Sequence, residues 1–153
     1  MQDAEAGFEG LPPGDRVKVY EAPGIRVRYD AGRCRHYAEC VRRAGEVFDP
    51  ERRPWIQPAN ADAERVAAAV RACPTGALHY LLPEGPAEEP ERPTVITPEP
   101  DGPLLVRGDL RIEAPAGAAE PSREVRAALC RCGASANKPF CDGSHERIGW
   151  HEA

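Results

Sequence analysis

Three cysteines and one histidine lie within sixteen residues near the C-terminus, and both side-chain types bind soft and borderline metal ions. They follow the pattern C-x-C-x8-C-x3-H, with Cys130, Cys132, Cys141 and His145. The C-x-C pair is too short for a helical turn and suits neighbouring ligands on an extended loop. Cys141 and His145 are four residues apart and would meet across one helical turn, which Asp142 and Gly143 can open. The stretch therefore predicts a four-ligand metal centre.

The same stretch resembles the iron–sulfur-binding CDGSH (NEET) domain. The family pattern C-x-C-x2-[ST]-x3-P-x-C-D-G-[ST]-H is met at every position, by Cys130, Cys132, Ser135, Pro139, Cys141, Asp142, Gly143, Ser144 and His145. The resemblance implies a [2Fe-2S] cluster with Cys130 and Cys132 on an inner iron, and with Cys141 and His145 on an outer, more exposed iron. A zinc site could use the same four side chains, although zinc sites usually pair cysteines as C-x2-C or C-x4-C. A disulfide would leave the spacing of the histidine unexplained.

The other three cysteines lie in the N-terminal half, at Cys34, Cys40 and Cys73, and Pro74 follows the last of them. Three cysteines spread over forty residues are, by themselves, also typical of buried structural thiols. The run from Val17 to Tyr80, with its Cys-Pro-x-Gly-Ala-Leu ending, is similar to the divergent three-cysteine 4Fe-4S mono-cluster domain. That resemblance implies that the three cysteines bind a second iron–sulfur cluster.

The nuclearity of this second cluster stays open. A cubane needs four iron ligands, and Tyr37 stands where related ferredoxins have their central cysteine. Because tyrosine is a poor ligand there, a [3Fe-4S] cluster that lacks this corner is the simplest expectation. The alternative is a [4Fe-4S] cluster completed by His36 or by solvent.

Composition favours two small domains over one ordinary domain. The 153 residues include only nine aromatic side chains and one methionine, against seventeen prolines and fourteen glycines. Domains with such small hydrophobic cores usually need an additional cross-link to be stable, and bound metal clusters would provide one. The two groups of three cysteines leave no thiol for a disulfide, which predicts a reducing compartment. With neither a signal-peptide pattern nor a long apolar run, the expectation is a soluble, cytoplasmic protein.

The net charge of −5 is concentrated in the segment 83–103, which holds six acidic residues and one arginine. Residues 1–82 and 104–153 each carry equal numbers of acidic and basic side chains. Neither half is therefore a generic acidic docking face, and no basic tract with interleaved aromatics supports nucleic-acid binding. Several arginines near the first three cysteines are compatible with a slightly basic docking rim, or with an ordinary solvated surface.

The predicted fold class is α+β: a small ferredoxin-like α/β domain followed by a CDGSH β-cap and its cluster-binding loop. Four segments are expected: a disordered N-terminus (1–15), the mono-cluster domain (16–82), an acidic Pro-rich linker (83–93) and the CDGSH domain (94–153). Alternating residues predict strands at 16–20, 25–29 and 77–82, and helical spacing predicts helices near 37–44 and 62–72, with Asp62 as the N-cap of the second helix. Further short strands are expected after residue 94, with Gly108-Asp109 as a hairpin turn.

The leading functional hypothesis is a two-cluster electron-transfer protein and not an enzyme. The sequence shows no nucleophile with its base, no catalytic carboxylate pair and no phosphate-binding loop. The expected partners are a reductase and an acceptor such as an oxygenase, and ferredoxins of this pattern often serve cytochromes P450; neither nucleic acid nor membrane is expected. Members with a single CDGSH motif often form homodimers, unless the ferredoxin half replaces the second subunit. The alternative is cluster storage, cluster transfer or redox sensing, because a protonated histidine ligand can release its iron.

Overall fold

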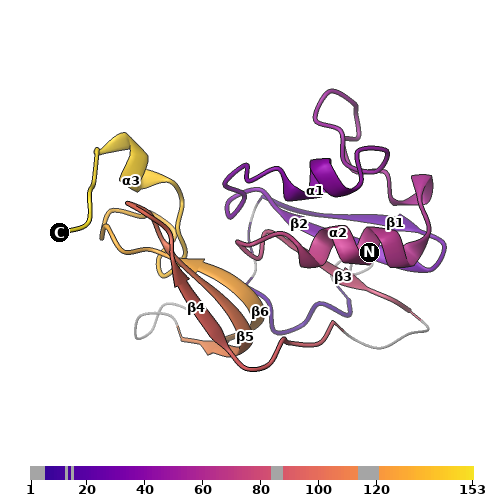
Figure 1. The fold of residues 1–153 in the computed structure, drawn as a ribbon. Coiled ribbons are helices and arrows are strands. Elements are labelled where there is room, and N and C mark those ends of the chain that lie inside the picture. Colours follow the sequence, from indigo (N-terminus) through magenta and orange to yellow (C-terminus); the bar gives the residue numbers. More distant parts are fainter. Residues whose placement is uncertain (1–5, 13, 15, 84–87, 114–120) are drawn as a thin grey trace.

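The computed structural model describes residues 6–12, 14, 16–83, 88–113 and 121–153. These residues form two three-stranded antiparallel sheets with a few short helices, so the predicted α+β class is confirmed. Figure 1 shows that each half of the chain builds one sheet and that the two sheets lie next to each other. None of the described helices is long and apolar enough to cross a membrane.

The first sheet has the order β1-β2-β3, with β1 at Val17–Ala22, β2 at Ile25–Asp30 and β3 at Leu78–Leu81. The segment between β2 and β3 contains α1 (Glu39–Arg43), a 3-10 turn (Pro58–Asn60) and α2 (Ala63–Arg71). Asp62 caps α2 as predicted, because its carboxylate accepts a hydrogen bond of 2.9 Å from the Arg65 N–H. All three predicted strands and both helices are present, although α1 is shorter than expected.

Buried side chains fill the space between α2 and the first sheet. Val66 and Val70 of α2 are fully buried in one hydrophobic core with Val27 of β2. Phe48 and Ile56 are also buried there, and they pair as an isolated antiparallel bridge. This core fixes the loops that leave β2 and α2, and the first three cysteines lie in or beside those loops.

The second sheet has the order β4-β5-β6, with β4 at Val95–Pro98, β5 at Leu104–Ile112 and β6 at Ser122–Leu129. The short helix α3 (Ser144–Arg147) follows near the C-terminus. The predicted hairpin at Gly108-Asp109 is wrong, because β5 runs through these residues and its pairing with β6 is irregular there. A Cβ on Gly108 would collide with Thr94. The glycine therefore permits a close approach of the chain and does not form a turn.

Parts of three predicted segments lie outside the described residues: 1–5, 13 and 15 of the N-terminus, 84–87 of the linker, and 114–120 of a loop. Within the described part of the N-terminus, Phe8 is buried, and the guanidinium of Arg26 lies 5.7 Å from the centre of its ring. The boundaries between the segments stay predictions.

A buried ion pair joins the two sheets. Arg33, in the loop after β2, donates hydrogen bonds of 3.2 and 2.9 Å to the two carboxylate oxygens of Glu124 on β6. The side chains are 1% and 0% exposed. The same guanidinium donates to the Thr75 carbonyl at 3.0 Å and lies 4.0 Å from the centre of the Phe140 ring. One arginine thus contacts the loops of both domains.

Further polar contacts extend this interface along β6. Arg126 lies two residues from Glu124 on the same face of the strand, and it donates to the Leu78 carbonyl at 2.7 Å. His79 is also buried, with Nε2 3.6 Å from Glu124. Burial, reinforced by the charges of Arg126, Arg33 and Arg28, holds the pKa of His79 well below its usual range. The histidine is therefore neutral at neutral pH and adds no further positive charge to the interface.

We predict that Glu124→Leu destabilises the protein strongly, because it leaves the Arg33 guanidinium buried without a carboxylate. Losing one partner of a buried pair costs about 3–5 kcal/mol. The thermal midpoint should fall by roughly 10 °C at a fixed scan rate. Glu46→Leu is the control, since it breaks the exposed Glu46–Arg65 pair and should leave the midpoint nearly unchanged. Equal losses in the two variants would show that the interface pair is not stabilising.

Candidate metal centres

The C-terminal candidate site lies at the end of β6. Cys130 follows the last residue of this strand, and its N–H donates to the Pro139 carbonyl at 2.9 Å. The Cys141 N–H donates to the Ala128 carbonyl at 2.8 Å, and Phe140 pairs with Leu129 as a bridge. The segment 139–141 therefore folds back along the end of β6 and brings Cys141 beside the C-x-C pair.

The four predicted ligands of this site are arranged as two pairs. The sulfur atoms of Cys130 and Cys132 are 3.8 Å apart, and the Cys141 sulfur is 3.6 Å from Nδ1 of His145. On a tetrahedral metal ion with metal–sulfur and metal–nitrogen bonds of about 2.3 and 2.0 Å, the two spacings would be about 3.8 and 3.5 Å. Each pair thus fits one metal atom. Across the described residues, no three His, Cys, Asp or Glu side chains form a group that could hold a single metal ion.

Backbone N–H groups point at the sulfur atoms of this site. Gly133 donates to Cys130 at 3.3 Å, Ala134 to Cys132 at 3.4 Å and Gly143 to Cys141 at 3.4 Å. Burial raises the pKa of the Cys130 thiol, but hydrogen bonds with the N–H groups of Ser135 and Gly133 and with Cys132 together outweigh burial and lower it overall. At Cys141 burial has the larger effect. It raises the pKa of this thiol, although the Gly143 N–H and the charge of Arg35 both lower it. The donors favour thiolates, the form that binds metal.

Asp142 holds the second half of the site together. Its two carboxylate oxygens accept hydrogen bonds from the Ala136 N–H at 2.8 Å and from the Ser144 N–H and hydroxyl at 2.9 and 2.6 Å. Burial alone would raise the Asp142 pKa, but these bonds lower it to about 2. Gly143 precedes α3 with a φ of 89°, which glycine adopts without strain. The turn predicted before α3 is present, and it presents His145 beside Cys141.

The N-terminal candidate site gathers the other three cysteines around one small cavity of about 30 Å³. Cys34 lies in the loop after β2, Cys40 lies in α1, and Cys73 follows α2 directly before Pro74. The sulfur of Cys73 is 3.5 Å from the Thr75 hydroxyl. Loops that are remote in sequence therefore converge, as the mono-cluster resemblance implies.

The three thiols influence one another electrostatically. Burial, followed by the charges of Cys73 and Cys34, raises the pKa of Cys40 to about 12. Burial also raises the pKa of Tyr29, followed by the charge of Cys34 and a hydrogen bond with it. Three thiolates around one cavity repel one another in the absence of a cation, so this donor set fits a positively charged metal cluster.

The loop that carries Cys34 has an unusual backbone. His36 and Ala38 have positive φ values of 60° and 64°, a conformation that costs non-glycine residues about 1–3 kcal/mol each. Left-handed residues in a loop turn backbone N–H groups toward one side, and such concave surfaces bind anions, including iron–sulfur clusters. The loop therefore has the curvature that a cluster with thiolate ligands requires.

The Tyr37 hydroxyl does not point to where the central cysteine of related ferredoxins would bind the cluster. The hydroxyl donates a hydrogen bond of 3.1 Å to Glu99, which follows β4. Burial first, and then the charge of Glu99, raises the Tyr37 pKa above its usual value. His36 is exposed and lines the small cavity, so it stays the candidate for the fourth cluster ligand.

The two candidate sites adjoin one cavity of about 310 Å³ between the domains. Arg35, His36 and Tyr37 line it from the N-terminal side, and Cys141 and His145 line it from the C-terminal side. A Cβ on Gly143 would collide with the Arg35 guanidinium, so the glycine also admits this side chain. The roles of Arg35 and Glu99 were missed in the sequence, because only the folded chain brings these residues to the other domain's loop.

Comparisons with known proteins agree with both resemblances. Residues 20–83 match the model of the divergent 4Fe-4S mono-cluster family, and residues 101–146 match the model of the iron-binding zinc finger of CDGSH type. The uncharacterized protein YjdI of Escherichia coli strain K12 is 36% identical over 63 residues, which cover 41% of this chain and 83% of that protein. YjdI of Escherichia coli O157:H7 gives the same values.

We predict that Cys73→Ser removes the N-terminal centre alone. An alcohol is a poor ligand for iron beside two thiolates, so the iron and sulfide of this centre should be lost. The absorption and the electron paramagnetic resonance (EPR) spectrum of the C-terminal centre should persist. Cys130→Ser is the matched control and should have the converse effect. An unchanged N-terminal signal in Cys73→Ser would show that Cys73 is not a ligand.

We further predict that Asp142→Asn weakens the C-terminal centre without removing any ligand. The amide keeps one acceptor oxygen, but its NH₂ group would face an N–H donor in place of the second oxygen. An unsatisfied donor of this kind costs about 1–3 kcal/mol. The variant should lose its C-terminal iron faster to an external chelator, as followed by visible absorption. Asp109→Asn, in surface ion pairs of β5, should match the unmodified protein, and equal rates in all three proteins would contradict this role.

Proposed function

Because the chain belongs to the divergent 4Fe-4S mono-cluster family and carries a CDGSH-type domain behind it, we propose that it is an electron carrier with two iron–sulfur centres. Both domain types make it a redox or cluster-handling protein. The observation that supports electron transfer is the cavity that both ligand loops line, with Arg35–Tyr37 on one side and Cys141 and His145 on the other.

The proposed ligands are Cys34, Cys40 and Cys73 for the first centre, and Cys130, Cys132, Cys141 and His145 for the second. We propose a [2Fe-2S] cluster for the second centre, since its donors form two pairs, one for each metal atom. The first centre is a [4Fe-4S] cluster if His36 or solvent completes it, and a [3Fe-4S] cluster otherwise. Bound clusters of these types accept and release single electrons.

The protein's own residues hold and shield these positions. Backbone N–H groups stabilise the thiolates of the second site, and Arg35 places a positive charge near Cys141. A positive charge beside a centre favours its more reduced, more negative state. Tyr37 and Glu99 tie the first ligand loop to the second domain. The arrangement keeps the two ligand loops in a fixed relation, as repeated electron transfer requires.

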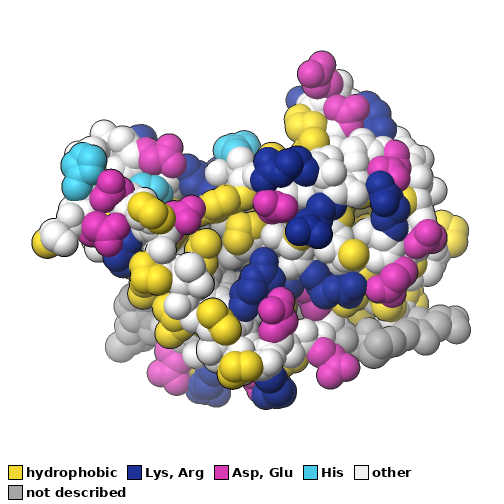
Figure 2. All heavy atoms as spheres, viewed as in Figure 1, with side chains coloured by type: hydrophobic (Ala, Val, Ile, Leu, Met, Phe, Trp, Pro, Cys, Tyr) yellow, Lys and Arg dark blue, Asp and Glu magenta, His cyan; other side chains and the backbone are white. Residues whose placement is uncertain are grey.

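The proposed partners are a reductase that supplies electrons and an acceptor such as an oxygenase, a cytochrome P450 or a biosynthetic enzyme. Figure 2 shows acidic and basic side chains interspersed over the face in view, which gives no large field of one sign. Docking would therefore depend on local shape and on individual ion pairs more than on long-range attraction. A cytoplasmic location is part of the same proposal.

A second candidate function is the transfer of the C-terminal cluster to another protein. It is favoured by the position of His145, whose side chain is 14% exposed while Cys141 is buried. A partly exposed histidine ligand can be replaced more easily than a buried thiolate. This function predicts an unstable centre, whereas electron transfer predicts a durable one.

One experiment separates the two functions. The oxidised and reduced holo-proteins are mixed anaerobically with an apo-ferredoxin, and visible absorption and the iron content of each separated protein are followed. We predict that both centres stay in place and survive repeated reduction and reoxidation. Rapid movement of iron and sulfide from the C-terminal site alone would contradict the electron-carrier proposal and support cluster transfer.

A further inference from the structure

A second, larger cavity lies beside the N-terminal candidate site. Its volume is about 510 Å³, within the usual range of about 300–1,000 Å³ for small-molecule sites. Aromatic side chains form much of its wall: Tyr20 from β1, Tyr29 from β2, and Trp55. The rings of Tyr29 and Trp55 meet edge to face, with centres 5.0 Å apart. Aromatic surfaces that remain partly exposed in a concave site are suited to contact a flat ring.

The cavity is also rich in positive charge. Arg16, Lys18 and Arg53 line it, and no acidic residue does so within the described part of the chain. Arg16 precedes β1, and Lys18 and Tyr20 follow at alternate positions, which places all three on one face of the extended chain. Arg53 is held by its hydrogen bond of 2.9 Å to the Pro50 carbonyl. None of the three cations forms an ion pair with a described residue, although the whole protein carries a net charge of −5.

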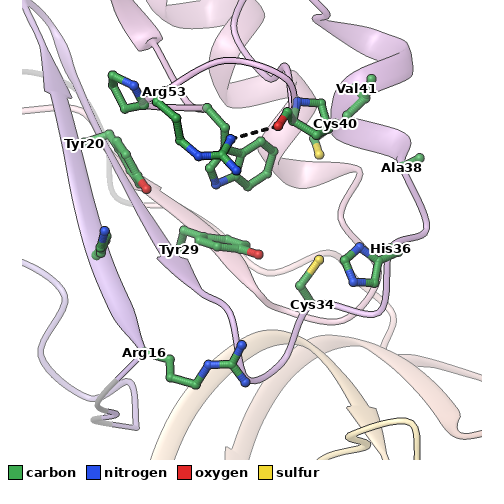
Figure 3. Close-up of a pocket in the computed structure, with 13 residues that line it drawn as sticks. Arg16, Tyr20, Tyr29, Cys34, His36, Ala38, Cys40, Val41 and Arg53 are labelled. Carbon is green, nitrogen blue, oxygen red and sulfur yellow. Dashed lines mark hydrogen bonds between the residues drawn. The ribbon is translucent and has the colours of Figure 1, made fainter.

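This cavity adjoins the smaller one that the three cysteines line, and the two share part of their walls. Cys34 and Cys40 line both cavities, whereas Cys73 lines only the smaller one. Figure 3 shows the sulfur atoms of Cys34 and Cys40 at one side, with Tyr20, Tyr29 and Arg53 at the other. The larger cavity therefore extends outward from the candidate centre, on the side away from Cys73.

We propose that this cavity binds a flat aromatic molecule that carries a phosphate or carboxylate group. The aromatic walls would contact the ring, and the three cations would pair with the anionic group, since arginine and lysine are the usual partners of phosphate and carboxylate. A docked protein chain fits less well, because the aromatic surfaces lie inside a concave site and not on a protruding face. The bound molecule would lie beside Cys34 and Cys40, within the first domain.

The test uses pairs of probes that differ only in charge. Flavin mononucleotide and riboflavin share one ring system, and only the first carries a phosphate; 2-naphthoate and 2-naphthamide form a smaller pair of the same kind. Binding to the holo-protein is measured by equilibrium dialysis without any reductant. We expect at least one anion to bind about tenfold more tightly than its neutral counterpart, which is the effect of one good charged contact.

Charge-reversal variants locate the site. Lys18→Glu and Arg53→Glu should each weaken binding of the anion about tenfold or more and leave binding of the neutral probe nearly unchanged. Arg111→Glu on β5 makes the same change in net charge on an exposed side chain of the other domain, and it should have little effect. Unchanged iron and sulfide contents establish that each variant keeps its fold and its centres.

Three results would overturn the proposal. In the first, neither anion binds detectably. In the second, the charged and neutral probes bind equally well. In the third, Arg111→Glu weakens binding as much as the cavity variants do. Because the measurement involves no electron transfer and no acceptor protein, its failure would leave the electron-carrier proposal untouched.

Discussion

The buried contact of Arg33 with Glu124 is the constraint on which the relation of the two candidate centres depends. Arg33 immediately precedes Cys34, and its guanidinium covers the ring of Phe140, which immediately precedes Cys141. One side chain is therefore fixed against the neighbours of candidate ligands in both sites. Burying an arginine is unfavourable unless its charge is compensated. One terminal nitrogen of Arg33 donates to both carboxylate oxygens of Glu124, and this ion pair supplies the compensation.

This constraint explains why small domains with modest cores can hold a defined geometry. The second domain contributes few buried apolar side chains, among them Val106, Ala127 and Phe140. Polar contacts along β6 and the tie between Tyr37 and Glu99 position its cluster loop against the first domain. Arg35 then reaches Gly143, so the glycine of the motif serves both the local turn and the contact between domains.

Much of the local chemistry could be predicted from the sequence, because it depends on residues that are close along the chain. The spacing of Cys130, Cys132, Cys141 and His145 predicted two neighbouring pairs, and Asp62 predicted the start of α2.

The prediction for β5 was wrong, because Gly108-Asp109 has the composition of a hairpin turn while the packing of Thr94 requires a glycine within the strand. The interface was not predicted, since nothing in the sequence distinguishes Arg33 and Glu124 from many exposed charged residues. The charged and aromatic cavity was missed for a similar reason: its wall combines alternate residues of β1 with a loop that starts some thirty residues later.

The central claim is that two iron–sulfur centres in one chain lie next to each other, at the sites built around Cys34 and Cys141. The most direct test is the EPR spectrum and spin relaxation of the protein with both centres reduced, compared with variants that retain only one centre. Neighbouring paramagnetic centres interact, so the account predicts broadened signals and faster relaxation than in either variant. A spectrum equal to the simple sum of the two single-centre spectra, with unchanged relaxation, would contradict it.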